Sequence, residues 1–296
     1  MMFFMKRNKI LFFLPAAAIW LAALIFAGFC DLDISLSFAD PMSVFGRFLE
    51  IVGEIPAILF ASFNCSLIAV CLLRRGTKGR DVILAALSII GMVGTAYYTT
   101  NATFGYIKGW RDDLGLSFIT GGMKFFLVFF ITAILSALFL FLAFRLSRER
   151  LEEFLPAAAH CVLAAIVTLF VIWCFKLLWG RVRFRQLEAL SQFTPFYIPN
   201  GYTGYFSFPS GHTANATVIL TVTYYFRFMS ERMKKLKPLL CTLLGLWIVV
   251  VALSRVLVGA HYLSDVLCGL AITALIVYLC RPRASLSEKG KQNVHR

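Results

Sequence analysis

Long apolar runs separated by short polar segments dominate the chain. About eight membrane-spanning helices are predicted, at residues 10–29, 55–73, 82–100, 122–144, 155–175, 213–229, 239–256 and 263–280. Apolar runs of about twenty residues match the hydrocarbon thickness of a bilayer. The third run contains two glycines and a polar end at Thr99 to Asn101, so it also fits a re-entrant or interfacial segment. The pattern predicts an all-α, polytopic transmembrane helix bundle.

The composition agrees with this pattern. Of the 296 residues, 60% are apolar, and the mean hydropathy is +0.80. A soluble protein of this composition would need polar helix faces, which most of the runs lack. The eight cysteines lie mostly in apolar runs without a CxxC pair, which predicts core residues and no disulfide or zinc framework. The first run is predicted to be a retained span, since no small-residue cleavage site ends it.

The net charge of +14 is predicted to reflect membrane topology and not nucleic-acid binding. With a cytoplasmic N-terminus, the cytoplasmic segments carry 20 of the 29 basic residues, in agreement with the positive-inside rule. The C-terminus is then cytoplasmic as well. The first outer loop is acidic, with Asp31, Asp33, Asp40, Glu50 and Glu54.

The outer segment between the fifth and sixth runs is unusually basic for its side. It carries Lys176, Arg181, Arg183 and Arg185. These side chains either extend to the membrane interface or bind an anionic ligand. The many aromatic residues of 185–208 fit an interfacial belt and equally a lid over a lipid headgroup.

Ser210, Gly211 and His212 stand where this outer segment turns into an apolar helix. A helix N-terminus offers unpaired N–H groups and a partial positive charge, which suit a phosphate. A histidine there can give or take a proton near neutral pH. A simple helix cap followed by an interfacial histidine explains these three residues equally well.

Arg255, His261 and Asp265 lie at the outer edge of the last two runs. If the last helix begins near His261, the spacing of four puts the histidine and the aspartate on one helix face. A carboxylate in that position fixes the tautomer of an imidazole and raises its basicity. The alternative is an interfacial pair that only anchors the helix.

Lys176 and Arg183 are seven residues apart, which is two helical turns. They share a face if the helix continues past Gly180. Together with Arg255 they make three cations available to one oxyanion, and the planar guanidinium suits phosphate.

These segments resemble the three signature motifs of the type 2 phosphatidic acid phosphatase superfamily. The motifs read Lys176-x6-Arg183, then Pro209-Ser210-Gly211-His212, then Ser254-Arg255-x5-His261-x3-Asp265, in the order found in the family. Residues 1–150 carry none of them. In one departure, Phe184 stands where the family usually has proline, which affects the expected geometry of the loop more than its chemistry.

The resemblance implies a role for each residue of these motifs. His261 is expected to be the nucleophile that forms a phosphohistidine, and Asp265 is expected to orient it. His212 is expected to protonate the leaving oxygen and then to activate water. The phosphate oxygens are expected to be held by Lys176, Arg183, Ser210, Gly211 and Arg255. No metal and no cofactor is expected, because the cations and the helix N-terminus supply the charge and the sequence lacks a carboxylate cluster.

The family core typically has six spans, with the motif lysine near the end of the third. Here the lysine ends the fifth run, which predicts two additional spans among the first four. The expected division is therefore 1–150, spans one to four and partly an addition to the six-helix phosphatase-like core; 151–283, the catalytic transmembrane region; and 284–296, a disordered cytoplasmic tail.

The predicted function is a lipid phosphatase of a bacterial cytoplasmic (inner) membrane, with its active site facing outward. Its partners are the bilayer and a lipid phosphate such as polyprenyl diphosphate, phosphatidylglycerol phosphate, phosphatidic acid or a lipid A phosphate. No nucleic acid and no obligate protein partner is expected. A lipid-linked phosphotransferase with the same site, or a non-catalytic protein that binds or transports lipid phosphates, are the alternatives.

Overall fold

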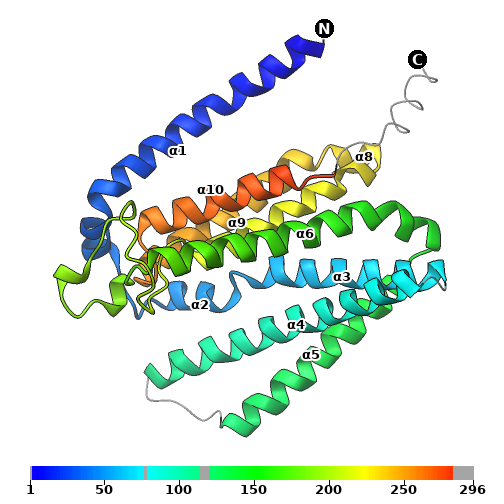
Figure 1. Cartoon of the computed structure of the whole chain (residues 1–296), viewed down its shortest axis with the longest axis horizontal. Coiled ribbons are helices and arrows are strands. Elements are labelled where there is room, and N and C mark those ends of the chain that lie inside the picture. Colours follow the sequence, from blue (N-terminus) through cyan, green and yellow to red (C-terminus); the bar gives the residue numbers. More distant parts are fainter. Residues whose placement is uncertain (1, 77–78, 114–119, 283–296) are drawn as a thin grey trace. The chain divides into compact units, whose positions relative to one another are not determined.

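Helices make up the fold (Figure 1). The computed structural model describes residues 2–76, 79–113 and 120–282, and the predicted disordered tail 284–296 lies outside them. The described part contains no β-strand, which confirms the all-α class. Its α-helices are α1 (Met2–Phe38), α2 (Val44–Val52), α3 (Ile55–Arg75), α4 (Gly79–Asp113), α5 (Gly121–Phe144), α6 (Arg148–Trp179), α7 (Gly211–Val218), α8 (Glu231–Lys234), α9 (Lys237–Leu257) and α10 (Leu263–Leu279). Three 3₁₀ helices are η1 (Phe184–Gln186), η2 (Leu190–Gln192) and η3 (Ile219–Phe228).

Six of the predicted spans lie in helical segments that are long and apolar enough to cross a membrane, among the residues described. They are Ala17–Phe38, Val44–Arg75, Gly79–Asp112, Gly121–Phe144, Arg148–Trp179 and Lys237–Leu257. The last predicted span is the shorter helix α10, of 17 residues. The count of about eight therefore holds only if α10 and the segment of α7 and η3 also cross.

The predicted span at 213–229 is not one regular α-helix. It consists of α7, with eight residues, followed by the ten-residue 3₁₀ helix η3. Threonine hydroxyls in this segment donate to backbone carbonyls, from Thr217 to Thr213 at 2.7 Å and from Thr221 to Val218 at 2.8 Å. Such bonds compete with the helical ladder and bend helices, which a count of apolar residues does not capture.

The third predicted span is a continuous helix, α4, and not a re-entrant segment. Its polar end is accommodated inside the helical structure. The hydroxyl of Thr99 donates to the carbonyl of Thr95 at 2.9 Å, and the hydroxyls of Thr100 and Thr132 lie 2.9 Å apart. Small hydroxyl residues of this kind join neighbouring helices inside membranes.

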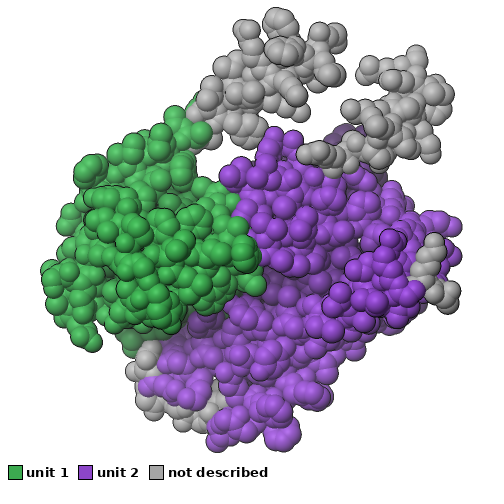
Figure 2. All heavy atoms as spheres, in the orientation of Figure 1, with its two compact units in different colours: residues 1–54, 168–217, 245–273 green, residues 55–167, 218–244, 274–296 purple. Residues whose placement is uncertain are grey.

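The chain divides into two compact units (Figure 2). Unit 1 comprises residues 1–54, 168–217 and 245–273, and unit 2 comprises residues 55–167, 218–244 and 274–296. Each unit takes segments from both sides of residue 150.

Unit 2 has an apolar interior and an apolar exterior. Leu67 of α3 packs with Ala143 of α5 and Leu151 of α6 in one core cluster. On the outside of α5, Phe126 and Phe129 are 71% and 67% exposed. Exposed phenylalanines on a helix face are favourable in contact with lipid and unfavourable in contact with water.

Unit 1 carries the residues of all three motifs. The C-terminal ends of α6 and α9 and the N-terminal ends of α7 and α10 bring them to one end of this unit. Helix α6 stops at Trp179, and Gly180 follows with a φ of +50°. A Cβ on Gly180 would lie 2.1 Å from the carbonyl oxygen of Gly201, so only glycine allows the chain to turn here.

Candidate active site

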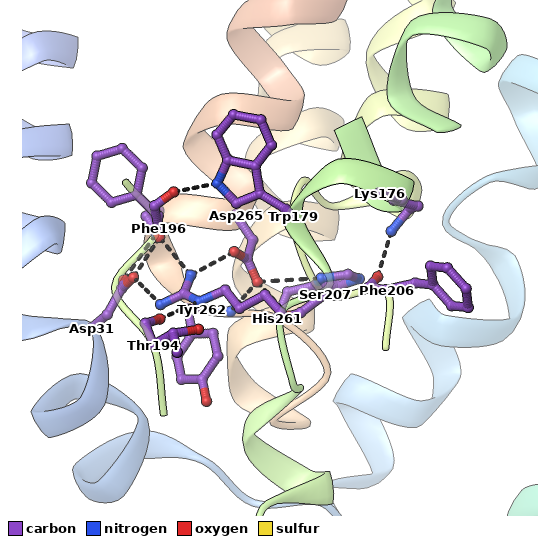
Figure 3. Close-up of polar contacts among 12 residues, drawn as sticks. Asp31, Lys176, Trp179, Thr194, Phe196, Phe206, Ser207, His261, Tyr262 and Asp265 are labelled. Atoms are coloured by element: carbon purple, nitrogen blue, oxygen red, sulfur yellow. Dashed lines mark hydrogen bonds and ion pairs between the residues drawn. The ribbon is translucent and has the colours of Figure 1, made fainter. Parts of the chain in front are cut away.

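Asp265 lies in the first turn of α10 and is fully buried. Its Oδ2 accepts hydrogen bonds from the backbone N–H of Tyr262 at 3.0 Å and from the Ser207 hydroxyl at 2.5 Å (Figure 3). A side chain at the third helical position that reaches back to the N-cap amide caps the helix. The local sequence therefore fixes this carboxylate against the turn that precedes α10.

Arg181 holds the other oxygen of Asp265. Its guanidinium lies 2.6 Å from Asp265 Oδ1 and 3.0 Å from Asp31 Oδ2, and it is fully buried. Its Cζ also lies 4.0 Å from the ring centroid of Tyr262. Burial alone would lower the pKa of Arg181, but the charges of Asp265 and Asp31 outweigh burial and raise it. The result is a charged arginine bridging two carboxylates.

Asp31, from the last turns of α1, also reaches the start of α10. Its Oδ1 accepts the backbone N–H of Ser264 at 3.0 Å, and its Oδ2 accepts the Ser264 hydroxyl. One of the unpaired N–H groups at the N-terminus of α10 is thereby satisfied from a segment 233 residues away in sequence.

His261 lies in the turn between α9 and α10 and not on the face of a helix. Its Nδ1 is 3.6 Å from Asp265 Oδ2, which is an ion-pair distance and too long for a hydrogen bond. The expected proximity of the two side chains is found, but the expected shared helix face is wrong, because α10 begins two residues later at Leu263. The capping contact of Asp265 produces the proximity instead.

The imidazole of His261 is held in its neutral form. Burial lowers its pKa to about 3, Asp265 opposes that shift, and the positive charges of Lys176 and Arg183 reinforce it. His261 is therefore unprotonated at neutral pH, and an unprotonated ring nitrogen is what nucleophilic attack requires.

Lys176 and Arg183 both act on His261, but they do not share a helix face. Lys176 is near the C-terminus of α6 and donates to the carbonyl of Phe206 at 2.6 Å. Arg183 lies beyond the break at Gly180, in extended backbone with φ −75° and ψ 148°. The predicted geometry was wrong because the helix stops at Trp179.

Ser210 and Gly211 form the start of α7, as predicted. The hydroxyl oxygen of Ser210 accepts a hydrogen bond from the backbone N–H of Thr213 at 3.3 Å. The backbone N–H of Ser210 donates to the carbonyl of Asp265 at 3.0 Å. A Cβ on Gly211 would lie 3.6 Å from Lys176 Cε. The second motif thus lies beside the lysine of the first and the aspartate of the third.

Arg255 is fully buried near the C-terminus of α9 and contacts α2. It donates to the carbonyl of Gly46 at 2.8 Å, and its Nη1 lies 3.3 Å from Glu50 Oε1. Arg185 reaches the same carboxylate oxygen at 3.1 Å. Two arginines therefore share one oxygen of a buried glutamate.

Residues 185–285 match the PAP2 superfamily. A 95-residue segment is 33% identical to "Phosphatidylglycerophosphatase B" of Bacillus subtilis (strain 168), which corresponds to 32% of this chain and 47% of that protein. The alignment thus spans about half the length of the curated relative. No solved structure matches the chain.

The PAP2 region contains the second and third motifs, with His212, Arg255, His261 and Asp265. Lys176 and Arg183 precede it. Phe184, which replaces the usual proline of the family, also precedes it and packs edge-on against Tyr262, with ring centroids 6.4 Å apart. The residue after it, Arg185, donates its N–H to the carbonyl of Gly259 at 2.9 Å. This loop is therefore attached to the turn that carries His261.

None of the three motifs includes Asp31, Glu50, Glu54 or Arg181, so the sequence assigned these four residues no specific role in the site. A usable signal was present, because the predicted topology puts the acidic first loop and the basic 176–185 segment on the same side of the membrane. Opposite charges of similar number at one membrane face favour pairing. Within the described residues, no group of three or more His, Cys, Asp and Glu side chains is placed to hold a metal ion.

Proposed function

We propose that this protein is a membrane lipid phosphatase that hydrolyses a phosphate monoester or diphosphate of a lipid through a phosphohistidine. The observation that carries the proposal is the buried imidazole of His261, whose Nδ1 lies 3.6 Å from Asp265 Oδ2. The match of residues 185–285 to the PAP2 superfamily and the name of the Bacillus subtilis relative support the same class of reaction.

In the first step, a ring nitrogen of His261 bonds to phosphorus while the bond from phosphorus to the lipid oxygen breaks. Protonated His212 gives its proton to that oxygen. The lipid therefore leaves as an alcohol from a monoester, or as a protonated lipid monophosphate from a diphosphate. In the second step, His212 takes a proton from water, whose oxygen bonds to phosphorus as the bond to His261 breaks. Inorganic phosphate leaves and both imidazoles return to their starting forms.

The charge of the phosphoryl group is met by protein groups. Lys176, Arg183 and Arg255 contribute the positive side chains, and Ser210 and Gly211 contribute the start of α7. Phosphoryl transfer depends mainly on positioning and on stabilisation of charge. The proposed reaction therefore proceeds without a metal ion.

Purified protein in detergent is expected to release inorganic phosphate from at least one member of a panel of phosphatidic acid, phosphatidylglycerol phosphate and polyprenyl diphosphate. Turnover is expected to be unchanged by EDTA and inhibited by vanadate, which mimics the trigonal bipyramidal transition state. Loss of turnover in EDTA, restored by added metal, would contradict the metal-free reaction. Binding of these lipids without any phosphate release favours the non-catalytic alternative, and phosphate passed to an added alcohol favours a phosphotransferase.

We further propose that the site faces the outside of a bacterial cytoplasmic membrane, because the positive-inside rule assigns segment 186–205 to that side. A cysteine at Ser191, which is exposed, is expected to react with a membrane-impermeant maleimide in intact cells whose native cysteines are replaced. A cysteine at Glu231, in the segment assigned to the cytoplasm, is the control and is expected to react only after permeabilisation. The opposite pattern overturns the orientation.

A further inference from the structure

Glu54, between α2 and α3, is bound to the motif histidine of α7. Its Oε1 lies 2.9 Å from His212 Nε2, and both side chains are about nine-tenths buried, at 10% and 12% exposure. The same nitrogen lies 3.2 Å from the backbone carbonyl of Glu50. Two acceptors from one segment thus fix the Nε2 end of the imidazole.

The second oxygen of Glu54 is fixed from the same helix face. Asn215 Nδ2 donates to Glu54 Oε2 at 2.5 Å. His212 and Asn215 are three residues apart in α7, and residues at that spacing lie side by side on a helix. The carboxylate is therefore held by two side chains of one helical turn, and its orientation toward the imidazole is defined at both oxygens.

The site contains two histidine–carboxylate pairs, and the pair with Glu54 is the closer one. The distance is 2.9 Å for His212 and Glu54, against 3.6 Å for His261 and Asp265. A carboxylate at hydrogen-bond distance fixes the orientation of an imidazole and forms an ion pair with its protonated form. Those are the two requirements of a general acid, namely a proton and a fixed direction for its transfer.

We propose that Glu54 is a positioning residue that holds His212 as the protonated acid for the leaving group. This inference rests on the proposed phosphatase function. Before the first step, ionised Glu54 pairs with the imidazolium of His212. The proton then moves from His212 to the leaving oxygen, and water returns a proton to His212 in the second step. Glu54 stays ionised throughout and touches neither substrate nor phosphorus.

Leaving-group dependence separates this role from a purely structural one. An alkoxide is a poor leaving group and needs a proton, whereas 4-nitrophenolate leaves without one. In full-length Glu54→Gln, kcat for a short-chain phosphatidic acid is expected to fall by about 10²-fold. On 4-nitrophenyl phosphate it is expected to fall by less than about threefold, and this retained turnover shows that the variant is folded. Asn215→Ala, which leaves the buried charge in place, is expected to show the same selectivity with a smaller loss.

A double-variant cycle with His212→Ala tests whether Glu54 acts through that histidine. Adding Glu54→Gln to His212→Ala is expected to cause no further loss on phosphatidic acid, because residues that act as a unit are non-additive. Equal losses on both substrates in Glu54→Gln and Asn215→Ala, or additive losses in the cycle, overturn the proposal while leaving the phosphatase function intact. If the wild-type protein turns over neither substrate, both the role of Glu54 and the phosphatase function are contradicted.

Discussion

Phosphate release from a lipid phosphate is expected to fall by at least about 10³-fold when His261 is replaced by alanine. The physical reason is that no other group at this position can form the covalent bond to phosphorus. Asp265, the neighbouring carboxylate, is occupied by Arg181, Ser207 and the Tyr262 amide and cannot take over as nucleophile. The measurement is inorganic phosphate released by purified protein in detergent.

His160→Ala is the matched control for this prediction. His160 lies in α6, in unit 2, and its Nδ1 lies 2.7 Å from the carbonyl of Pro156. Turnover in this variant is expected to stay within about twofold of wild type, since His160 belongs to none of the three motifs and lies in the unit that carries none of their residues. Near wild-type phosphate release by His261→Ala would show that the nucleophile has been wrongly assigned.

Arg181→Met is expected to be the most destabilising substitution in the cluster, at about 3–5 kcal/mol of unfolding free energy. It leaves Asp31 and Asp265 as buried, like-charged carboxylates without their shared cation. The measurement is the thermal unfolding midpoint of the purified protein in detergent. Adding Asp31→Asn to Arg181→Met is expected to recover part of the loss, because it removes one of the two unpaired charges.

Arg185→Met is the comparison, because Arg185 is an arginine of the same loop. Its side chain is 22% exposed, and its carboxylate partner Glu50 keeps ion pairs with Arg47 and Arg255. The loss in this variant is expected to be below about 1 kcal/mol. Similar losses of unfolding free energy in the two arginine variants would contradict the prediction that the bridge from Arg181 to Asp31 and Asp265 is the more important for stability.

Part of this site could be predicted from sequence because its chemistry is encoded in local spacing. The helix start at Gly211 and the nearness of His261 and Asp265 follow from residues a few positions apart. The position at which each helix ends was harder to predict from the sequence. Helix α6 ends at Trp179, and the next residue, Gly180, lies against the backbone of Gly201, a contact that forms only in the folded chain.

The sequence does not show which carboxylates of the acidic first loop are buried in the site. Asp31, Glu50 and Glu54 are buried, whereas Asp33 and Asp40 of the same acidic stretch are not. The sequence shows five similar side chains, and burial distinguishes them only after α1, α2 and the 176–185 segment have packed. Likewise, the run at 213–229 has the apolar count of an ordinary span, and that count does not show that its second half is a 3₁₀ helix.

The Asp31–Arg181 contact also sets an order of events during synthesis. Asp31 emerges from the ribosome 150 residues before Arg181, and 233 residues before Ser264, whose amide it caps. Until then the carboxylate has to remain hydrated at the membrane surface, since an unpaired charge is expensive in lipid. The contacts of Asp31 are therefore complete only after α10, the last helix within the described residues, has been synthesised.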